Sequence, residues 1–498
     1  MNFEKRMQKR GNKNLDELTP NLYEKPRRFP LWAKIAIPVG SIALASVLAV
    51  SIIVPNIAGK NIAHINQLVK PTVEKVTKTY NSNLSQATYN SYSAFSKKFV
   101  SYMMEVNNLE KEDSLGISIP DAYLCLAITG VISTDDARAD ILNYLELSDM
   151  NALRTAVKEI LATMGTLFEN QDGKLVGGYN LNSIWLNPEK VHLLKEKDEQ
   201  LYEDLAKVFD ASLYFTALTS DAANQYLKEN GLKDMPVPEI QLDDEDPSAM
   251  NTMSVYYCLD YFAEEAKEYY KQQYDSQNHK LDYTFKGQET KVDYIERTSL
   301  DEVLKGDNFY GANMNIGHLS MQYFLPNEKT ALPSSILDDV LNENYAPVET
   351  TYFYIDENEN EVELPTKLQN IHISAPYFSL DNKTTLGRSD LKKVLPVITD
   401  HGAGERLAAT YSGYPMYLDY VKQFSVMKFN YDGFYSCSVT IAGYDAESAQ
   451  YEPIYKDFNL TLDHPYVFEV CKTLRIGNNK TVRVPIVVGE IVTPTYEN

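Results

Sequence analysis

The chain is 498 residues long, 44% hydrophobic and 11% aromatic, which is enough apolar material for a sizeable buried core. Its formal net charge of −22 at pH 7 argues against nucleic acid or an anionic membrane surface as the partner of the bulk of the chain. Four widely spaced cysteines form no CxxC pair, so zinc sites and thioredoxin-type redox chemistry gain little support: Cys125, Cys258, Cys437 and Cys471. A disulfide framework is not needed at this size, and the disulfide state of the four stays open.

The N-terminal region joins a basic tail to a long apolar run. Lys and Arg outnumber the four acids of residues 1–30, and Ile35–Val54 runs for twenty residues without a charge. Such a run is long enough to cross a bilayer. The alternatives are a buried core helix and a cleaved signal peptide, which has a shorter core and rarely follows so long a leader. We predict a transmembrane helix over 31–55 in a single-pass cell-membrane protein, with residues 1–30 cytoplasmic and the C-terminal domain extracellular.

The composition changes twice beyond this run. Residues 56–86 are polar with few apolar anchors, which is typical of a stalk or linker. From 87 to 498 the chain has the composition of a globular protein, without an internal repeat, a low-complexity tract or a convincing linker. We therefore predict a single domain over 87–498, which is large for one domain.

The stretch Val421–Thr440 combines two β-compatible segments with a flexible break. Gln423 to Phe429 alternates between apolar and polar residues and predicts a half-buried strand. Asn430, Asp432 and Gly433 then release the backbone from the strand. Phe434–Thr440 is β-compatible again, with small side chains on one alternate face: Ser436, Ser438 and Thr440. The pattern fits either an ordinary strand–turn–strand pair or a segment that joins a sheet conditionally.

Several segments of the chain resemble one known family. Gln423, Asn430 and Gly433 are spaced as in the last central-sheet strand and the hinge of the serpins, a family of protease inhibitors. Further segments resemble serpin elements in the family's order: Ile117–Ile128, Leu181–Leu186, Gly317–Pro326, Ala375–Phe378, Tyr411–Gly413, Leu462–Phe468 and Gly489–Pro494. The resemblance implies an α+β fold, a single large domain with three β-sheets, about nine helices and an exposed reactive-centre loop.

The resemblance also implies a site. It places the reactive-centre loop, here called the bait loop, at about 433–461, where a target protease would cut. Its hinge would consist of Asp432, Gly433, Phe434, Tyr435, Ser436, Cys437, Ser438, Val439 and Thr440. Counting forward from Gly433 by the family's usual spacing puts the cut bond at Glu447–Ser448, and counting back from Pro465 puts it at Ile454–Tyr455. We prefer Glu447–Ser448, because the hinge end of the register is better anchored.

The chain also departs from the family's pattern. Phe434 is bulky on the face of the hinge that would enter the sheet, and overpacking there costs about 1–3 kcal/mol and slows insertion. Met253 and Tyr261 stand near positions where the family has Asn and Trp. Tyr354–Glu363 has the composition of a polar, acidic turn. The departures keep a second interpretation open, a non-inhibitory serpin-fold binding or structural protein at the cell surface.

Catalytic and cofactor motifs are missing from the sequence. It contains no GxxxxGK[ST], HExxH, GxSxG or DxDxDG-type loop, and its seven histidines are scattered singly. We therefore expect no enzyme, no catalytic residue, no metal and no cofactor; an uncharacterised enzyme is the third interpretation, without residues to nominate. The resemblance implies a monomer that inhibits serine or cysteine proteases as a suicide pseudo-substrate and meets the membrane through its N-terminal helix.

Overall fold

The structure, a computed structural model, describes residues 67–496 apart from short gaps. The gaps are 73–74, 78–80, 109–112, 134, 170–173, 194–198, 233–234, 236, 263, 277–278, 356–360, 401–409, 412–415, 436–453 and 478–479. The predicted cytoplasmic tail and transmembrane helix lie outside the described residues and stay predictions. Among the helices that are described, none is both long and apolar enough to span a membrane. Contacts divide the chain into residues 1–59 and 60–498, and all described residues belong to the second unit.

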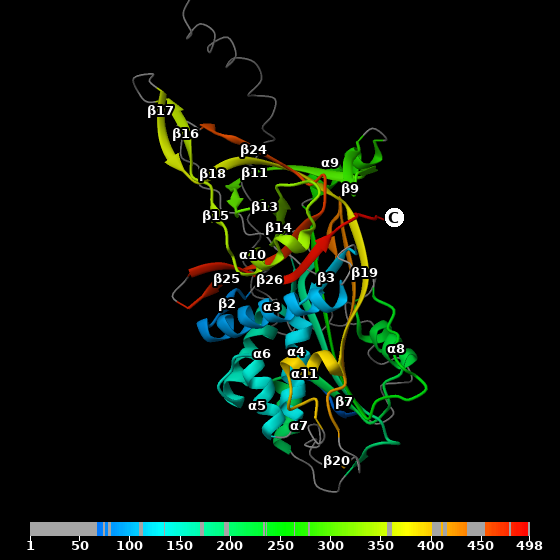
Figure 1. Cartoon of the computed structure of the whole chain (residues 1–498). Helices are drawn as coiled ribbons and strands as arrows, with labels where there is room; N and C mark the ends of the chain where they lie inside the picture. Colours follow the sequence, from blue (N-terminus) through cyan, green and yellow to red (C-terminus); the bar gives the residue numbers. More distant parts are fainter. Residues whose placement is uncertain are drawn as a thin grey trace, which may run out of the picture. The chain divides into compact units, whose positions relative to one another are not determined.

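The described residues form nine α-helices, six of which precede Met250. These six are α3 (Gln86–Asn107), α4 (Pro120–Ile132), α5 (Asp135–Tyr144), α6 (Met150–Met164), α7 (Glu199–Lys207) and α8 (Ser220–Asn230). The later ones are α9 (Glu264–Asp275), α10 (Leu337–Leu341) and α11 (Arg388–Val394), with a 3₁₀ turn, η2, at Pro333–Ser335. Figure 1 shows α3 to α7 gathered in one group. This helix content agrees with the number that the resemblance implied.

One sheet of eight strands, here called the central sheet, contains the predicted strand of residues 423–429. Its order is β1-β7-β5-β8-β22-β21-β19, and β4 pairs with β5 off this path. The strands are β1 (Gln67–Val69), β4 (Leu167–Glu169), β5 (Leu175–Leu186), β7 (Ala211–Tyr214), β8 (Met250–Tyr261), β19 (Phe378–Gly387), β21 (Tyr420–Asn430) and β22 (Gly433–Tyr435). Neighbours such as β8 and β21 are far apart in the sequence, so long-range pairing builds this sheet.

A second eight-stranded sheet contains the C-terminal strands. Its order is β15-β12-β13-β14-β25-β26-β3, and β2 pairs with β25. The strands are β2 (Asn83–Leu84), β3 (Leu115–Ser118), β12 (Leu304–Lys305), β13 (Phe309–Ile316), β14 (Leu319–Pro326), β15 (Ala346–Pro347), β25 (Tyr466–Ile476) and β26 (Lys480–Ile491). Since β1 and β2 lie within 67–84, that part of the predicted stalk contributes strands to both large sheets.

The remaining described strands form four smaller sheets. A three-stranded sheet has the order β11-β18-β24, with β11 (Tyr294–Glu302), β18 (Leu368–Pro376) and β24 (Asp457–Thr461). Another has the order β17-β16-β23, with β16 (Thr350–Ile355), β17 (Glu361–Thr366) and β23 (Ile454–Tyr455). Two pairs complete the set: β9 (Leu281–Phe285) with β10 (Gln288–Val292), and β6 (His192–Leu193) with β20 (Thr410–Tyr411). The described strands thus form six sheets, three more than the resemblance implied.

Helix α4 lies at the centre of the packing. Its sequence is apolar around almost its whole circumference, which is typical of a helix buried on all sides. Pro120 occupies the first turn, where a missing N–H is tolerated. Tyr123 of α4 contacts Tyr92 and Phe95 of α3, with ring centroids 5.7 and 5.3 Å apart. The helix also packs against β8 of the central sheet, so it forms the layer beneath that sheet.

Candidate functional site

The central sheet contains an open strand position. β8 pairs with β5 from Met250 to Leu259, and β21 pairs with β19 from Tyr420 to Phe429. Among the described strands, the facing edges of β8 and β21 pair only with the three residues of β22. No other described strand joins the two edges below Tyr435. We call this open position, between residues 250–258 of β8 and 420–427 of β21, the slot.

A cavity of about 690 Å³ occupies the slot. Residues 250–257 of β8 and 420–427 of β21 line its two sides. Its floor is one face of α4, where Ala122, Cys125 and Thr129 recur at helical spacing. Leu227 of α8 and residues of the segment that joins α8 to β8, such as Ile240, complete the lining. The cavity therefore has the position of a missing strand, between two laddered halves of one sheet.

The first residues of the predicted hinge, β22, lie at the end of the slot beside Asp260 and Phe429, here called its upper end. Phe434 is opposite Asp260 of β8 and Phe429 of β21, and Gly433 is opposite Tyr261 and Asn430. The Phe434 side chain is fully buried and belongs to the hydrophobic core. The sequence predicted that this ring hinders the first step of insertion. In the structure the ring is packed in the core at the start of β22, and its effect on the rate of insertion stays a prediction.

The register of β22 also constrains the residues after Tyr435. Continued antiparallel pairing would place residues 436–443 opposite 258–251 of β8 and 427–420 of β21. Because alternate side chains share a face, those facing inward with Phe434 would be Ser436, Ser438, Thr440 and Ala442. All four are small enough to lie over α4. Ser436–Thr440 of the predicted hinge and the bond Glu447–Ser448 lie outside the described residues, so their place stays a prediction.

Polar contacts hold each side of the slot to the layer beneath it. On β21, Gln423 donates to the Ser118 carbonyl oxygen at 2.7 Å and accepts from the Ser118 N–H at 2.9 Å. Its amide also donates to Asp121 Oδ2 at 3.2 Å. Burial raises the pKa of the Asp121 carboxyl to about 6, although hydrogen bonds from Ser118 and Gln423 oppose this shift. On β8, the Thr252 hydroxyl lies 3.1 Å from that of Thr129 on α4.

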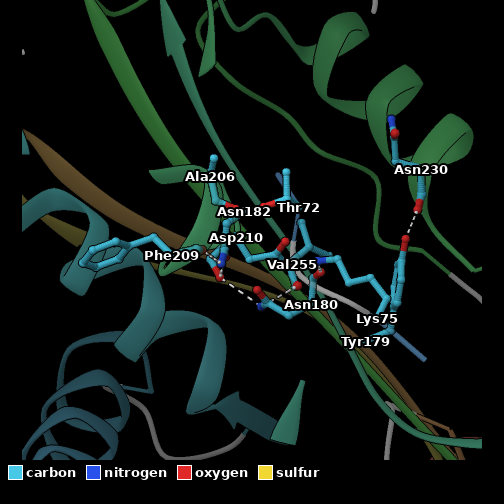
Figure 2. A network of polar contacts seen from close by, with 11 residues as sticks. Thr72, Lys75, Tyr179, Asn180, Asn182, Ala206, Phe209, Asp210, Asn230 and Val255 are labelled. Carbon is cyan, nitrogen blue, oxygen red and sulfur yellow. Dashed lines mark hydrogen bonds and ion pairs between the residues drawn. The ribbon is translucent and has the colours of Figure 1, made fainter. Parts of the chain in front are cut away.

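A second network fixes β8 to the rest of its half of the sheet (Figure 2). Asn180 of β5 donates to the Val255 carbonyl oxygen at 3.0 Å, and Asn182 of β5 donates to that of Phe209 at 2.8 Å. The Lys75 ammonium group, from the segment before α3, contacts both Asp210 and the Asn180 carbonyl oxygen. Burial lowers the pKa of Lys75 to about 7. The half of the sheet made of β1, β7, β5 and β8 is therefore tied together as one unit.

Buried ionisable groups lie beside the hinge. Asp260 Oδ2 accepts from the His318 backbone N–H at 2.6 Å. Burial raises the pKa of the Asp260 carboxyl to about 9 and lowers that of Lys472 to about 8. Gly317 has φ +54°, and a Cβ there would lie 1.6 Å from Asp260 Oδ2, so only glycine fits. Asp260 is thus a neutral carboxylic acid at pH 7, in the strand that pairs with the hinge.

The replacement Asp260→Asn tests this protonation state. Because the folded-state pKa lies above the ordinary value, the folded protein keeps a proton that the unfolded chain loses above about pH 4. Asp260 therefore lowers the free energy of unfolding progressively as pH rises from about 4 to 9. We expect D260N to make Tm fall less steeply between pH 5 and 8. Thermal melts across this range measure the slope, with exposed Asp282→Asn as the control; equal slopes in all three proteins would contradict the assignment.

Sequence analysis predicted part of this site. It placed Asp432, Gly433, Phe434 and Tyr435 in the predicted hinge. The structure has Gly433–Tyr435 as β22, between β8 and β21, with Asp432 directly before it, and their role as a hinge stays a prediction. The alternative cut at Ile454–Tyr455 falls within β23, which pairs with β16. Sequence analysis missed Asp121, Asp260 and Lys472, because nothing local in the sequence shows that these residues are buried near the slot.

Cysteine and metal chemistry contribute little to the described part of the site. Within the described residues, Cys125, Cys258 and Cys471 form no disulfide, and Cys437 lies outside those residues. Burial raises the pKa of the Cys125 thiol to about 11, so it is protonated and unreactive at neutral pH. Within the described ranges, no three His, Cys, Asp or Glu side chains come together as a metal site would require.

Comparison with solved structures identifies the fold. The native state of tengpin, a thermophilic serpin, matches with a TM-score of 0.55 and 15% identity over 84% of this chain and 97% of that one. A serpin from the trematode Schistosoma haematobium matches at 0.53 and 16% over 81% and 100%. Thyroxine-binding globulin, in complex with thyroxine, matches at 0.54 and 12% over 82% and 99%. No protein-family model and no curated protein matches the sequence. The chain has the serpin fold, and identities this low show the fold alone.

Proposed function

We propose that the protein is a protease inhibitor that acts as a suicide pseudo-substrate, and that it is not an enzyme. The observation that carries the proposal is the slot, a strand position left open in a large sheet. The strand β22 occupies one end of this position, and residues 436–443 follow β22 directly in the chain. An unfilled strand position leaves backbone groups unpaired, which is unfavourable inside a protein. The resting fold therefore stores free energy that insertion of residues 436–443 would release.

The mechanism uses this geometry directly. A protease nucleophile attacks the carbonyl carbon of Glu447, the amine of Ser448 leaves with a proton, and an acyl-enzyme remains on the N-terminal side of the cut. The freed residues then pair with β8 and β21, displacing the segment between α8 and β8 where it lines the slot. Eight inserted residues span about 26 Å. The captured protease is carried with them before water can hydrolyse the ester.

The bait loop restricts the class of protease. Residues 436–453 contain no Lys or Arg, so a trypsin-like enzyme has no site there. Glu447 suits a glutamate-preferring protease, and Tyr444 and Tyr451 suit a chymotrypsin-like one. The proposed target is therefore a serine or cysteine protease with one of these two preferences, bound by a monomer of the inhibitor.

We also propose that the inhibitor acts at the cell surface. The support is the uncharged run Ile35–Val54 with its basic N-terminal flank, which would anchor residues 1–30 in the cytoplasm and the serpin-fold domain outside the cell. Extraction of intact cells with alkaline carbonate tests the anchor. Release of the protein into the soluble fraction would contradict it.

A non-inhibitory binding protein is the second candidate. The observation that favours it is the cavity of about 690 Å³, which lies within the range of small-molecule sites. Thyroxine-binding globulin, a structural neighbour, was solved with a bound small molecule. Under this alternative, the slot would hold a ligand and cleavage of the bait loop would not trap a protease.

Incubation of the full chain with chymotrypsin or glutamyl endopeptidase separates the two candidates. An inhibitor forms a complex with the protease that survives denaturing electrophoresis, and the protease loses activity in proportion. The control is the same protease with its catalytic serine blocked, which cannot form the ester. Complete cleavage of the bait loop with the protease fully active would rule out inhibition and favour the binding protein.

A further inference from the structure

The three-stranded sheet β17-β16-β23 includes residues from the C-terminal part of the bait loop. The hairpin of β16 and β17 pairs with β23, so that Tyr352 is opposite Tyr455 and Phe353 is opposite Ile454. β23 begins directly after residues 436–453. In Figure 1 this hairpin lies well apart from helices α3 to α7. The sheet β17-β16-β23 is thus placed beside the segment that a protease would have to reach.

Lys456 makes polar and cation–π contacts on one face of this sheet. Its ammonium group donates to the Thr351 hydroxyl at 2.7 Å, lies 3.5 Å from Glu363 Oε1 and is 5.5 Å from the centre of the Phe353 ring. In addition, the Asn370 backbone N–H donates to the Lys456 carbonyl oxygen at 2.9 Å. These contacts hold the end of the bait loop to both β16 and β18. Because a segment held in a sheet enters a protease cleft poorly, we expect the cut in the loop before Ile454.

The opposite face is apolar, and the hydrophobic core of the described residues does not cover it. Directly paired residues share a face, and here these are Tyr352, Tyr354, Val362, Leu364 and Tyr455. The Tyr352 ring lies 5.4 Å from that of Tyr455 and 6.4 Å from that of Tyr354. Leu364 is 38% exposed, and the other four are half-buried. None of the five packs against the hydrophobic core of the described residues. A contiguous aromatic and aliphatic face that the described core leaves partly exposed marks an interaction surface.

We propose that this face is an exosite for the target protease, a second docking surface used while the bait loop occupies the catalytic cleft. This inference rests on the proposed function. Ser448 and Ile454 are six positions apart in the sequence, a stretch that spans at most about 20 Å. A protease of about 230 residues has a radius of gyration of about 17 Å. Its body therefore overlies the sheet whenever Glu447–Ser448 is in its cleft.

Exposed charges at the edge of the sheet define the kind of partner. Glu361 and Glu363 are exposed on the edge strand β17, on the face that carries Lys456, and Glu363 is paired with Lys456. The whole chain has a net charge of −22. A protease with an apolar patch and a Lys- or Arg-bearing rim beside its cleft complements this surface. Tyrosine is one of the residue types that dominate binding energy at interfaces. Complementary charge adds mainly to the association rate.

Strand addition at the edge of β17 is a poorer use of the same sheet. Glu361 and Glu363 place two charges along that edge, and Pro365 removes a backbone donor from it. Natural sheets carry such residues on edges that must not pair with another chain. A second copy of this chain that adds a strand at this edge is therefore disfavoured.

The test compares the full chain with a free peptide of residues 436–453, which contains the bait but not the sheet. A panel of chymotrypsin-, subtilisin- and papain-like proteases and glutamyl endopeptidase is used, and kcat/KM for cleavage is measured on both substrates. We expect at least one protease to cut the chain about tenfold faster than the peptide. We expect the double variant Tyr352→Ala/Leu364→Ser to lose this advantage.

A control double variant and a charge variant accompany this test. Tyr269→Ala/Leu300→Ser changes residues that are 56% and 48% exposed elsewhere, and it should retain the rate advantage. Glu361→Lys should slow cleavage of the chain several-fold at low salt and not at high salt, unlike Glu289→Lys on exposed β10. Because Glu361→Lys leaves the aromatic face intact, it also covers the case in which the double variant unfolds.

The outcomes separate this inference from the proposed function. A chain-to-peptide ratio of one or less for every protease, or equal rates for all variants, overturns the exosite even if a covalent complex forms. Concentration-dependent dimerisation that the double variant abolishes would assign the face to a second copy and also overturn it. If the chain-to-peptide ratio of kcat/KM falls in the double variant but no covalent complex forms with any protease, the result supports the exosite and contradicts inhibition.

Discussion

Cleavage of the bait loop is expected to raise the Tm of the protein by about 10 °C. The freed residues 436–443 would pair with both free edges of the slot, β8 and β21. About sixteen new backbone hydrogen bonds, at about 0.5–1.5 kcal/mol each, give on the order of 10 kcal/mol. An unfolding entropy of about 2.1 cal/mol/K per residue over this domain converts this free energy to about 10 °C. Thermal melts before and after cleavage by glutamyl endopeptidase measure the change.

The alternation of the inserted strand provides a matched control. Thr440 is predicted to face inward, over α4, whereas Val439 is predicted to face solvent. An arginine buried over α4 without a partner is strongly unfavourable, so Thr440→Arg should be cleaved normally and lose the gain in Tm. Val439→Arg should keep the gain. If the wild-type chain showed no gain, or if both variants kept it, the slot would not be the acceptor of the bait loop.

The two strands of the hinge region were predictable because their signals are local. Alternation from Gln423 to Phe429 corresponds to β21, and the break at Asn430–Gly433 separates it from β22 as expected. The slot was not visible in the same way. It exists because β8 and β21, more than 150 residues apart in the sequence, stay unpaired below Tyr435, and only the register of the whole sheet shows this. Only the resemblance to serpins supplied an expectation of such a gap.

The hairpin of β16 and β17 shows how local composition misleads. The sequence from Tyr354 to Glu363 is acidic and polar, which predicted a turn, yet both ends of this stretch lie in strands. Charged residues are disfavoured inside a sheet but are common on an exposed edge, and β17 is an edge strand. The partner that completes the sheet, β23, is about 100 residues further along the chain. A pattern read within a short window cannot show that pairing.

Replacing Gly433 by valine is expected to lower the free energy of unfolding by about 3 kcal/mol or more. Gly433 has φ +145°, a backbone conformation that side chains with a Cβ branch rarely adopt. A Cβ there would also lie 2.3 Å from the Asp260 carbonyl oxygen and 3.0 Å from Tyr261 Cα, both backbone atoms of β8. Strain contributes about 1–2 kcal/mol and overpacking a further 1–3 kcal/mol. Chemical denaturation measures the change.

Gly287→Val separates the two contributions. Gly287, in the turn between β9 and β10, also has a positive φ, +75°, but no heavy atom lies within 4 Å of its Cβ position. It should therefore show the backbone strain alone, about 1–2 kcal/mol. A bulky residue at 433 also drives the hinge out of the slot, since the adjacent backbone of β8 cannot retreat without breaking its ladder with β5. Equal losses for the two variants would mean that β22 is not held between β8 and β21, and the stored free energy that we propose as the driving force for inhibition would then have no structural basis.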